Sequence, residues 1–206
     1  MGKIVSTFQF VGKVGNAVGM KGENGIPSAR IWVKPNNPRT VKQMQQRTKM
    51  ALMARFCSRI GGFLRAGFND SRHWFAKAVK TNIHDVIGGT YPAYELLYNK
   101  FLVSNGLLEL PYSPSAVIDS QSLNVSWTDN SGIGFASGSD DAMLLVYNSA
   151  KGQAVYRLDA GKREDRQGTM TLPTAWSGDS VDVWMAMRSS DTTRTSESVY
   201  LGNFSI

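Results

Sequence analysis

From Ala116 onward the sequence alternates between apolar and polar residues in short runs, and this pattern constrains the fold more than any other feature. Roughly six or seven such runs, separated by turn residues, fit into about 90 residues. Ser122–Trp127 alternates, and Ala142–Tyr147 is densely apolar, as a central strand should be. The spacing is typical of an immunoglobulin-like or fibronectin-III-like β-sandwich, with Trp127 in its core.

The first stretch of the chain, to about Lys34, is rich in glycine, which disfavours helix and permits tight turns. Arg30–Lys34 predicts a short strand, and Glu23–Gly25 predicts a turn. We therefore expect a β-hairpin or a pair of extended arms. So small a hairpin is marginal alone, and it should lie on the rest of this chain or on a neighbouring chain.

Two helices are expected between this arm and the sandwich. The first follows the N-cap candidate Thr40 and weakens or ends at Gly61–Gly62. Residues at steps of three or four form one largely apolar stripe along it, namely Val41, Met44, Thr48, Leu52, Phe56, Ile60 and Phe63. The second helix starts near Asn69–Ser71, and a short connection favours antiparallel packing. Tyr94–Val103 and Leu107–Leu110 predict a pair of strands around an Asn-Gly turn.

These elements add up to an α+β fold in two domains. Residues 1–111 form a basic assembly domain of a glycine-rich β-arm and a helical hairpin, and residues 112–206 form the immunoglobulin-like β-sandwich. No apolar run approaches the roughly 18 residues that span a bilayer. The start also lacks the features of a secretory signal, so we expect no membrane partner.

The charge of the chain is divided unevenly along its length. The whole sequence has 23 basic and 16 acidic residues, a net charge of +7. Residues 1–80 carry 15 of the bases and two of the acids, a net +13, which leaves −6 for residues 81–206. Such asymmetry suggests a polyanionic or acidic partner for the front, or head-to-tail contact between copies. A solvated basic face is the plainer alternative.

The basic first helix is the strongest functional feature of the sequence. The residues expected to contact a partner or nucleic acid are Arg39, Lys42, Arg47, Lys49, Arg55 and Arg59. Lys42, Lys49, Arg55 and Arg59 fall off the apolar stripe. Such bases could neutralise phosphates without reading base sequence, or they could face acidic neighbours in an assembly. Nothing resembles the recognition helix of a known DNA-binding motif.

Four other features invite a chemical interpretation, and a structural one is favoured for each. His84–Asp85 is the only His-Asp pair, but two histidines cannot furnish the usual ligand set of a metal-dependent hydrolase. Cys57, the sole cysteine, adjoins the apolar stripe, and Gly15–Gly22 lacks the Gly-Lys-Ser/Thr end of a phosphate loop. The polar loop Asp129–Asp141 could hold Ca²⁺, but its spacing does not match an EF-hand. We expect no catalytic residue, no cofactor and no metal, with an ion at that loop left open.

Five short motifs are spread over nearly the whole chain. They are Gly12–Asn16 (GKVGN), Val33–Thr40 (VKPNNPRT) followed by Gln43 and Gln46-Arg47, Thr90–Pro92 (TYP), Trp127–Gly132 (WTDNSG) and Val199–Gly202 (VYLG). Together they resemble an uncharacterised family of gut Bacteroides-type bacteria and their phages. The family brings no known activity. The resemblance implies a phage or mobile-element context, and with it a virion component.

We therefore expect a non-enzymatic structural or assembly protein of a phage virion, present in many copies. Its basic N-terminal half would contact nucleic acid or acidic partner subunits, and its partners would be further copies of itself or other virion proteins. The alternative is a sequence-nonspecific nucleic-acid-binding protein in the host cytoplasm. An enzyme has the least support. Position in the particle, copy number and symmetry stay open.

Overall fold

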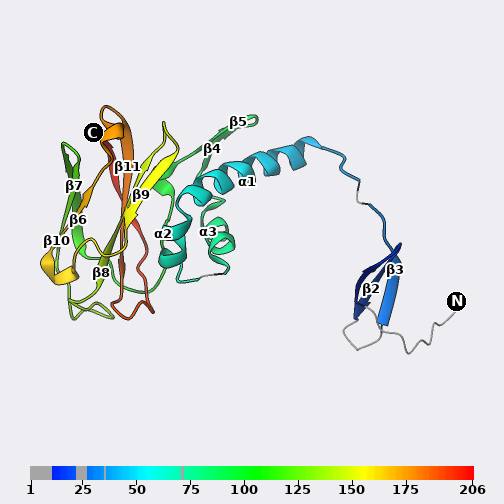
Figure 1. The fold of residues 1–206 in the computed structure, drawn as a ribbon, viewed down its shortest axis with the longest axis horizontal. Coiled ribbons are helices and arrows are strands. Elements are labelled where there is room, and N and C mark those ends of the chain that lie inside the picture. The colour runs from blue at the N-terminus through cyan, green and yellow to red at the C-terminus, as the bar shows by residue number, and fades with distance from the viewer. Residues whose placement is uncertain (1–10, 22–26, 35, 71) are drawn as a thin grey trace. The chain divides into compact units, whose positions relative to one another are not determined.

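The computed structural model describes residues 11–21, 27–34, 36–70 and 72–206. Contacts divide the chain into two compact units, Met1–Thr40 and Val41–Ile206. The described residues form three α-helices and twelve strands, and the strands of all four sheets pair antiparallel. The predicted α+β class is therefore confirmed (Figure 1). None of the helices in these ranges is long and apolar enough to cross a membrane.

The first unit contains a three-stranded sheet in the order β1–β2–β3. Its strands are β1 (Gly12–Val14), β2 (Ala17–Lys21) and β3 (Pro27–Ile31). Gly15 begins the two-residue turn between β1 and β2 with a φ of +56°, a conformation that glycine adopts without strain. The strand expected at Arg30–Lys34 starts earlier and ends at Ile31, and the turn expected at Glu23–Gly25 lies outside the described residues.

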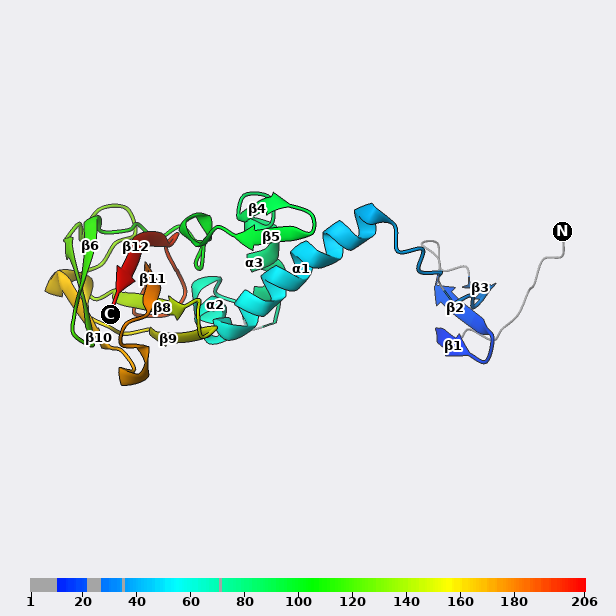
Figure 2. The same ribbon diagram turned by 90° about the horizontal axis from the view of Figure 1, so that it is seen from above.

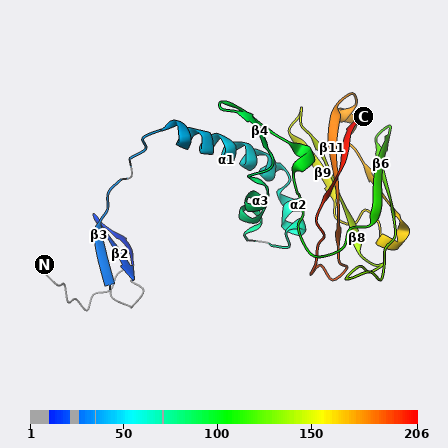
Figure 3. The same ribbon diagram turned by 180° about the vertical axis from the view of Figure 1, so that it is seen from behind.

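Two sheets make up most of the second unit, with the strand orders β10–β7–β6 and β12–β11–β8–β9. Their strands are β6 (Tyr112–Asp119), β7 (Ser122–Thr128), β8 (Asp141–Asn148), β9 (Gln153–Arg157), β10 (Gln167–Thr171), β11 (Ser180–Arg188) and β12 (Val199–Ser205). Figure 3 shows the helices on one side of the four-stranded sheet and β6 on the other. The unit is thus built of three layers.

Successive side chains of β8 point alternately into the two spaces between these layers. Met143, Leu145 and Tyr147 join the core beneath the helices, whereas Leu144 and Val146 join the core between the two sheets. β11 divides its side chains in the same way. A strand covered on both faces needs no polar side, which explains why β8 is apolar along most of its length.

The helices share a core with the sheet beneath them. They are α1 (Val41–Arg59), α2 (Gly61–Gly67) and α3 (Trp74–Asn82). Because this core includes Trp184 and Ala186 of β11 as well as Phe63 of α2, helices and sheet cluster as one unit. The boundary predicted at residue 111 lies inside that unit.

The predicted helix signals agree with the structure only in part, because three helices form where two were expected and the glycine pair Gly61–Gly62 begins α2. α1 stops at Arg59, just before the glycine pair. Ahead of α3, Oδ1 of Asp70 accepts hydrogen bonds from the backbone N–H groups of Arg72 (2.8 Å) and His73 (2.7 Å). These bonds, together with the nearby Lys77 ammonium, hold the pKa of Asp70 well below its usual range.

The strand pair predicted at Tyr94–Val103 and Leu107–Leu110 is wrong. The hairpin lies earlier, with β4 (Ile87–Thr90) and β5 (Ala93–Leu96) joined by Tyr91 and Pro92. A 3₁₀ turn follows at Tyr98–Lys100, and Leu107–Leu110 holds only an isolated bridge. The aromatic and branched residues of this stretch anchor the helical core instead: Phe101 and Val103 are buried, and Nε1 of Trp184 donates to the Phe101 carbonyl at 3.0 Å.

Candidate interaction surface

The helix α1 is anchored at only one end. Its buried residues, Met53, Phe56 and Cys57, all lie in its second half. In the first half Val41 is exposed and Met44 and Thr48 are half-buried, and Leu52, just past the middle, is half-buried too. Figure 2 shows this half extending beyond the sheets with the β4–β5 hairpin alongside. The predicted apolar stripe is thus buried only from Phe56 onward, because the earlier turns have too little structure to pack against.

Five of the six predicted contact residues project from α1, and four of them are exposed. The exposed ones are Lys42, Arg47, Arg55 and Arg59, and Lys49 is half-buried. At about 100° per residue, Lys42 and Lys49 lie on the same side of the helix as the buried Met53, and the three arginines lie on its other sides. The expectation that Lys42 and Lys49 avoid the apolar side is therefore wrong. The bases surround α1 instead of forming one stripe.

The sixth residue, Arg39, belongs to the first unit and precedes α1. It is exposed, and its φ of +50° lies in the left-handed region.

Most of these bases lack an acidic partner. Four of them form no ion pair with any other described residue: Lys42, Lys49, Arg55 and Arg59. The Lys49 ammonium lies 5.1 Å from the centre of the Tyr94 ring of β5, so it is held by a cation–π contact. By contrast, Lys151 and Lys162 are paired with carboxylates in the sheet region. The charges of these four residues are therefore available to an external anion.

A shallow hollow of about 550 Å³ lies beside the anchored half of α1. Leu52, Phe56 and Tyr98 contribute apolar surface, and Arg55 and Glu95 contribute charge. Burial raises the pKa of Tyr98 far above its usual value, so its phenol stays protonated. The hollow offers an aromatic wall with an arginine at its edge.

The first unit adds apolar surface outside the six predicted contact residues. Its described residues expose six large hydrophobic side chains, those of Val11, Val14, Met20, Ile31, Trp32 and Val33. Its described ranges contain bases and no acid. The sequence did contain one indication of this surface. A small hairpin has no core of its own, so its apolar side chains must be covered by another part of the protein or by another chain.

The sequence matches a model of a known protein family. A family model described as "Family of unknown function (DUF6266)" matches residues 9–202. The chain belongs to this family. The predicted resemblance to an uncharacterised family is thereby confirmed, and the association of DUF6266 with Bacteroides-type bacteria and phages stays an expectation. A search of curated proteins found no match.

In this DUF6266 chain, the residues considered for catalysis or metal binding are scattered. His84 and Asp85 are exposed and follow the end of α3. Cys57 is fully buried, and burial raises the pKa of its thiol to about 12, which suppresses the reactive thiolate. Gly15 forms a hairpin turn between two strands. Within the described ranges, no three His, Cys, Asp or Glu residues gather as a metal site would require.

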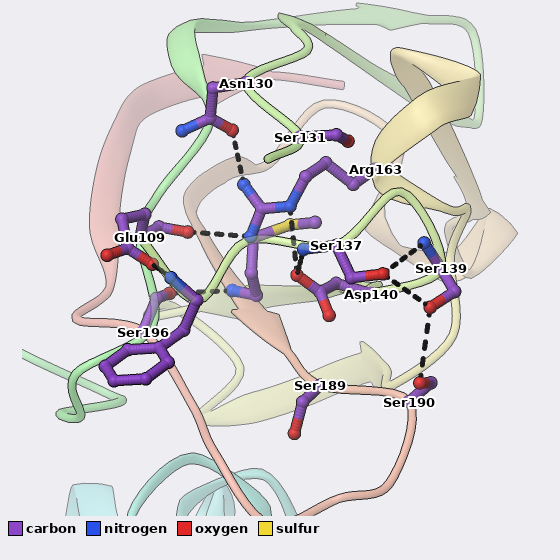
Figure 4. Close-up of polar contacts among 12 residues, drawn as sticks. Glu109, Asn130, Ser131, Ser137, Ser139, Asp140, Arg163, Ser189, Ser190 and Ser196 are labelled. Atoms are coloured by element: carbon purple, nitrogen blue, oxygen red, sulfur yellow. Dashed lines mark hydrogen bonds and ion pairs between the residues drawn. The ribbon is translucent and has the colours of Figure 1, made fainter. Parts of the chain in front are cut away.

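The polar loop Asp129–Asp141 is held by protein partners (Figure 4). Arg163, which is fully buried, donates from Nε to Oδ2 of Asp140 (3.1 Å) and from Nη1 to Oδ1 of Asn130 (2.5 Å). Its Nη2 donates to the carbonyl of Glu109 at 2.8 Å. Hydrogen bonds from Ser131 lower the pKa of Asp129, and Asp141 pairs with Lys162. The carboxylates thus serve as internal acceptors, and Arg163 ties the loop to the segment before β6.

Proposed function

We propose that this chain is a non-enzymatic structural subunit that assembles in many copies, as in a phage virion. The observation that carries the proposal is the first unit, whose small sheet exposes large apolar side chains. Among its described strand residues with a burial class only Gly19 is buried, so most of its apolar side chains have no cover within the described part of the unit. Its exposed apolar residues are typical of a surface that is covered in an assembly. The bases of α1 would face acidic neighbours or packaged nucleic acid.

We further propose that the two-sheet region is immunoglobulin-like or fibronectin-III-like. If β6 to β12 are labelled A, B, C, C′, E, F and G in chain order, one sheet holds A, B and E and the other holds G, F, C and C′. This distribution of strands supports the proposal, since the immunoglobulin fold places A, B and E opposite C, F and G. Trp127 is buried, as expected for a core tryptophan, but it lies on strand B and not on strand C, where immunoglobulin domains carry their buried tryptophan.

Removing residues 1–40 tests the assembly role. The full chain should form a defined oligomer, and the truncated chain should lose it while keeping the thermal midpoint of unfolding of the second unit, which has its own cores. Native mass spectrometry and calorimetry measure the two quantities. A full chain that is a monodisperse monomer, together with a deletion that changes neither quantity, would contradict the proposal.

Sequence-nonspecific nucleic-acid binding is the second candidate function, and it is favoured by the bases of α1 that form no ion pair with a described residue, namely Lys42, Lys49, Arg55 and Arg59. Affinity for duplex DNA should then fall with salt, with a log–log slope of about 0.9 per phosphate neutralised. Lys42→Ala, Arg55→Ala and Arg59→Ala should each reduce that slope by about 1 or less. Lys151→Ala is the matched control, because this lysine is already paired with Asp179. Salt-independent binding excludes this function.

A further inference from the structure

The register of the three-stranded sheet gives its two faces different chemistry. Residues paired across strands point to the same face, and successive rows alternate between faces. Two rows of small or aliphatic residues share one face, namely Gly12–Gly19–Ala29 and Val14–Ala17–Ile31. The row between them, Lys13–Val18–Arg30, points to the opposite face. We call the face that carries the two rows of small or aliphatic residues the aliphatic face, and the face that carries the row Lys13–Val18–Arg30 the basic face.

The two rows of the aliphatic face differ in height. The row Val14–Ala17–Ile31 forms a ridge, and the row Gly12–Gly19–Ala29 forms a groove. Val14 and Ile31 stand at the two ends of one row, and their side chains are 62% and 78% exposed. The neighbouring row consists of two glycines and an alanine, so it is lower than the first; Gly19 at its centre is buried, and Gly12 and Ala29 at its ends are exposed. A methyl group built on Gly12 would meet no atom within 4 Å, which shows that the groove is open at that end.

We propose that the aliphatic face packs against the same face of a second copy of this chain. A two-fold axis parallel to the rows, lying between ridge and groove, brings the ridge of each sheet over the groove of the other. Such self-complementary contact is the commonest interface between identical subunits. Side chains of two packed sheets interdigitate in this way at a separation of about 10 Å. The inference rests on the proposed function and names the partner of the arm.

The distribution of charge favours a second copy over a polyanion at this face. Lys13 and Arg30 lie on the basic face, so two basic arms can meet without bringing these like charges together. Lys21 belongs to the next row on the aliphatic side, Lys21–Pro27, and the two-fold axis places that row of each copy at opposite ends of the contact. The Lys13 ammonium stays there, 3.6 Å from the centre of the Trp32 ring. A nucleic acid would bind on that basic side, whereas the two aliphatic rows offer only apolar contact.

The size of the face determines how the contact must be tested. Six residues from each copy bury far less than the roughly 1,200 Å² of a stable interface. The contact would therefore act as one of several in an assembly, where linkage between sites strengthens weak contacts. A covalent trap applied to the assembled full-length chain is the suitable measurement.

Single cysteines placed on the two faces provide that trap. Ala29→Cys lies on the aliphatic face, and the adjacent Ser28→Cys lies on the basic face as its matched control; both positions are exposed. The only native thiol, Cys57, is fully buried, so the wild-type chain serves as the blank. With a short bis-maleimide, Ala29→Cys should give covalent dimers at least tenfold faster than Ser28→Cys. Equal rates, or no dimer from Ala29→Cys, would overturn the proposal.

A second substitution checks that the trapped dimer reports on the face itself. Adding Ile31→Lys to Ala29→Cys should abolish the cross-link, whereas adding Arg30→Ala should leave it, since residue 30 lies on the basic face. Unchanged cross-linking with Ile31→Lys would also overturn the proposal. Native mass, measured first, separates the two levels of argument. A monomeric wild-type chain contradicts the proposed function, whereas an assembled chain without the selective cross-link contradicts only this inference.

Discussion

Replacing Arg163 with methionine should lower the free energy of unfolding by about 3–5 kcal/mol, the cost of leaving a buried charge without its partner. Arg163 has no exposed surface, and Asp140 would remain buried beside the new apolar side chain. The substitution also removes the hydrogen bonds to Asn130 and to the Glu109 carbonyl. Urea denaturation of the full chain, followed by tryptophan fluorescence, measures the loss.

The neighbouring Lys162 provides the matched control for that substitution. Its ammonium pairs with Asp141 at 2.6 Å, but its side chain is 44% exposed, so Lys162→Met should cost less than about 1 kcal/mol. Replacing Arg163 and Asp140 together by apolar residues should recover part of the loss, because no unpaired charge remains. If Arg163→Met and Lys162→Met lowered the free energy of unfolding equally, burial of the Arg163–Asp140 pair would add nothing to its contribution to stability.

Replacing Phe56 with alanine should cost about 3–5 kcal/mol, the usual range for a buried phenylalanine. Phe56 is the central contact between α1 and the sheet. Its ring centroid lies near four other aromatic rings: those of Tyr98 (5.3 Å), Phe101 (4.7 Å), Tyr147 (4.8 Å) and Trp184 (6.1 Å). Because helices and sheet share this core, far-UV circular dichroism and tryptophan fluorescence should report the same transition in the wild-type chain.

Met50→Ala on the same helix is the comparison for Phe56→Ala. Met50 is 37% exposed and lies in the half of α1 that is poorly covered, so its truncation should change stability by no more than about 0.5 kcal/mol. If Phe56→Ala were equally mild, or if the two probes gave separate transitions for the wild-type chain, the shared core would not be the unit that unfolds.

The parts of the fold with a regular hydrophobic period could be predicted from the sequence. β7 alternates and β8 is apolar, and both were located because their side chains fill one or two cores. α1 was located by its period and by the glycines after it. The stretch after β5 was misread, because aromatic residues that favour strands also serve as core anchors. Only the packed structure shows that Phe101 and Val103 fill the helical core.

The candidate surface was predictable in its charge and not in its geometry. The excess of bases is a property of composition, so the sequence identified Lys42, Arg55 and Arg59 directly. The faces of the N-terminal sheet depend on register, which a glycine-rich segment specifies weakly because it has few side chains to bury. The burial of Arg163 was equally hidden, because nothing in the neighbourhood of this residue in the sequence distinguishes it from an exposed arginine.

If the chain is a subunit of an assembly, as proposed, the half-anchored helix affects how accurately that assembly grows. Turns of α1 without core partners should open far more often than those around Phe56. When these turns become ordered at a contact with another subunit, they lose conformational entropy, and this loss weakens the affinity of that contact. A subunit held by one contact then leaves quickly, whereas a subunit held by several remains. Because each contact is weak, a misplaced subunit that makes few contacts would dissociate before further subunits are added, and the error would be corrected.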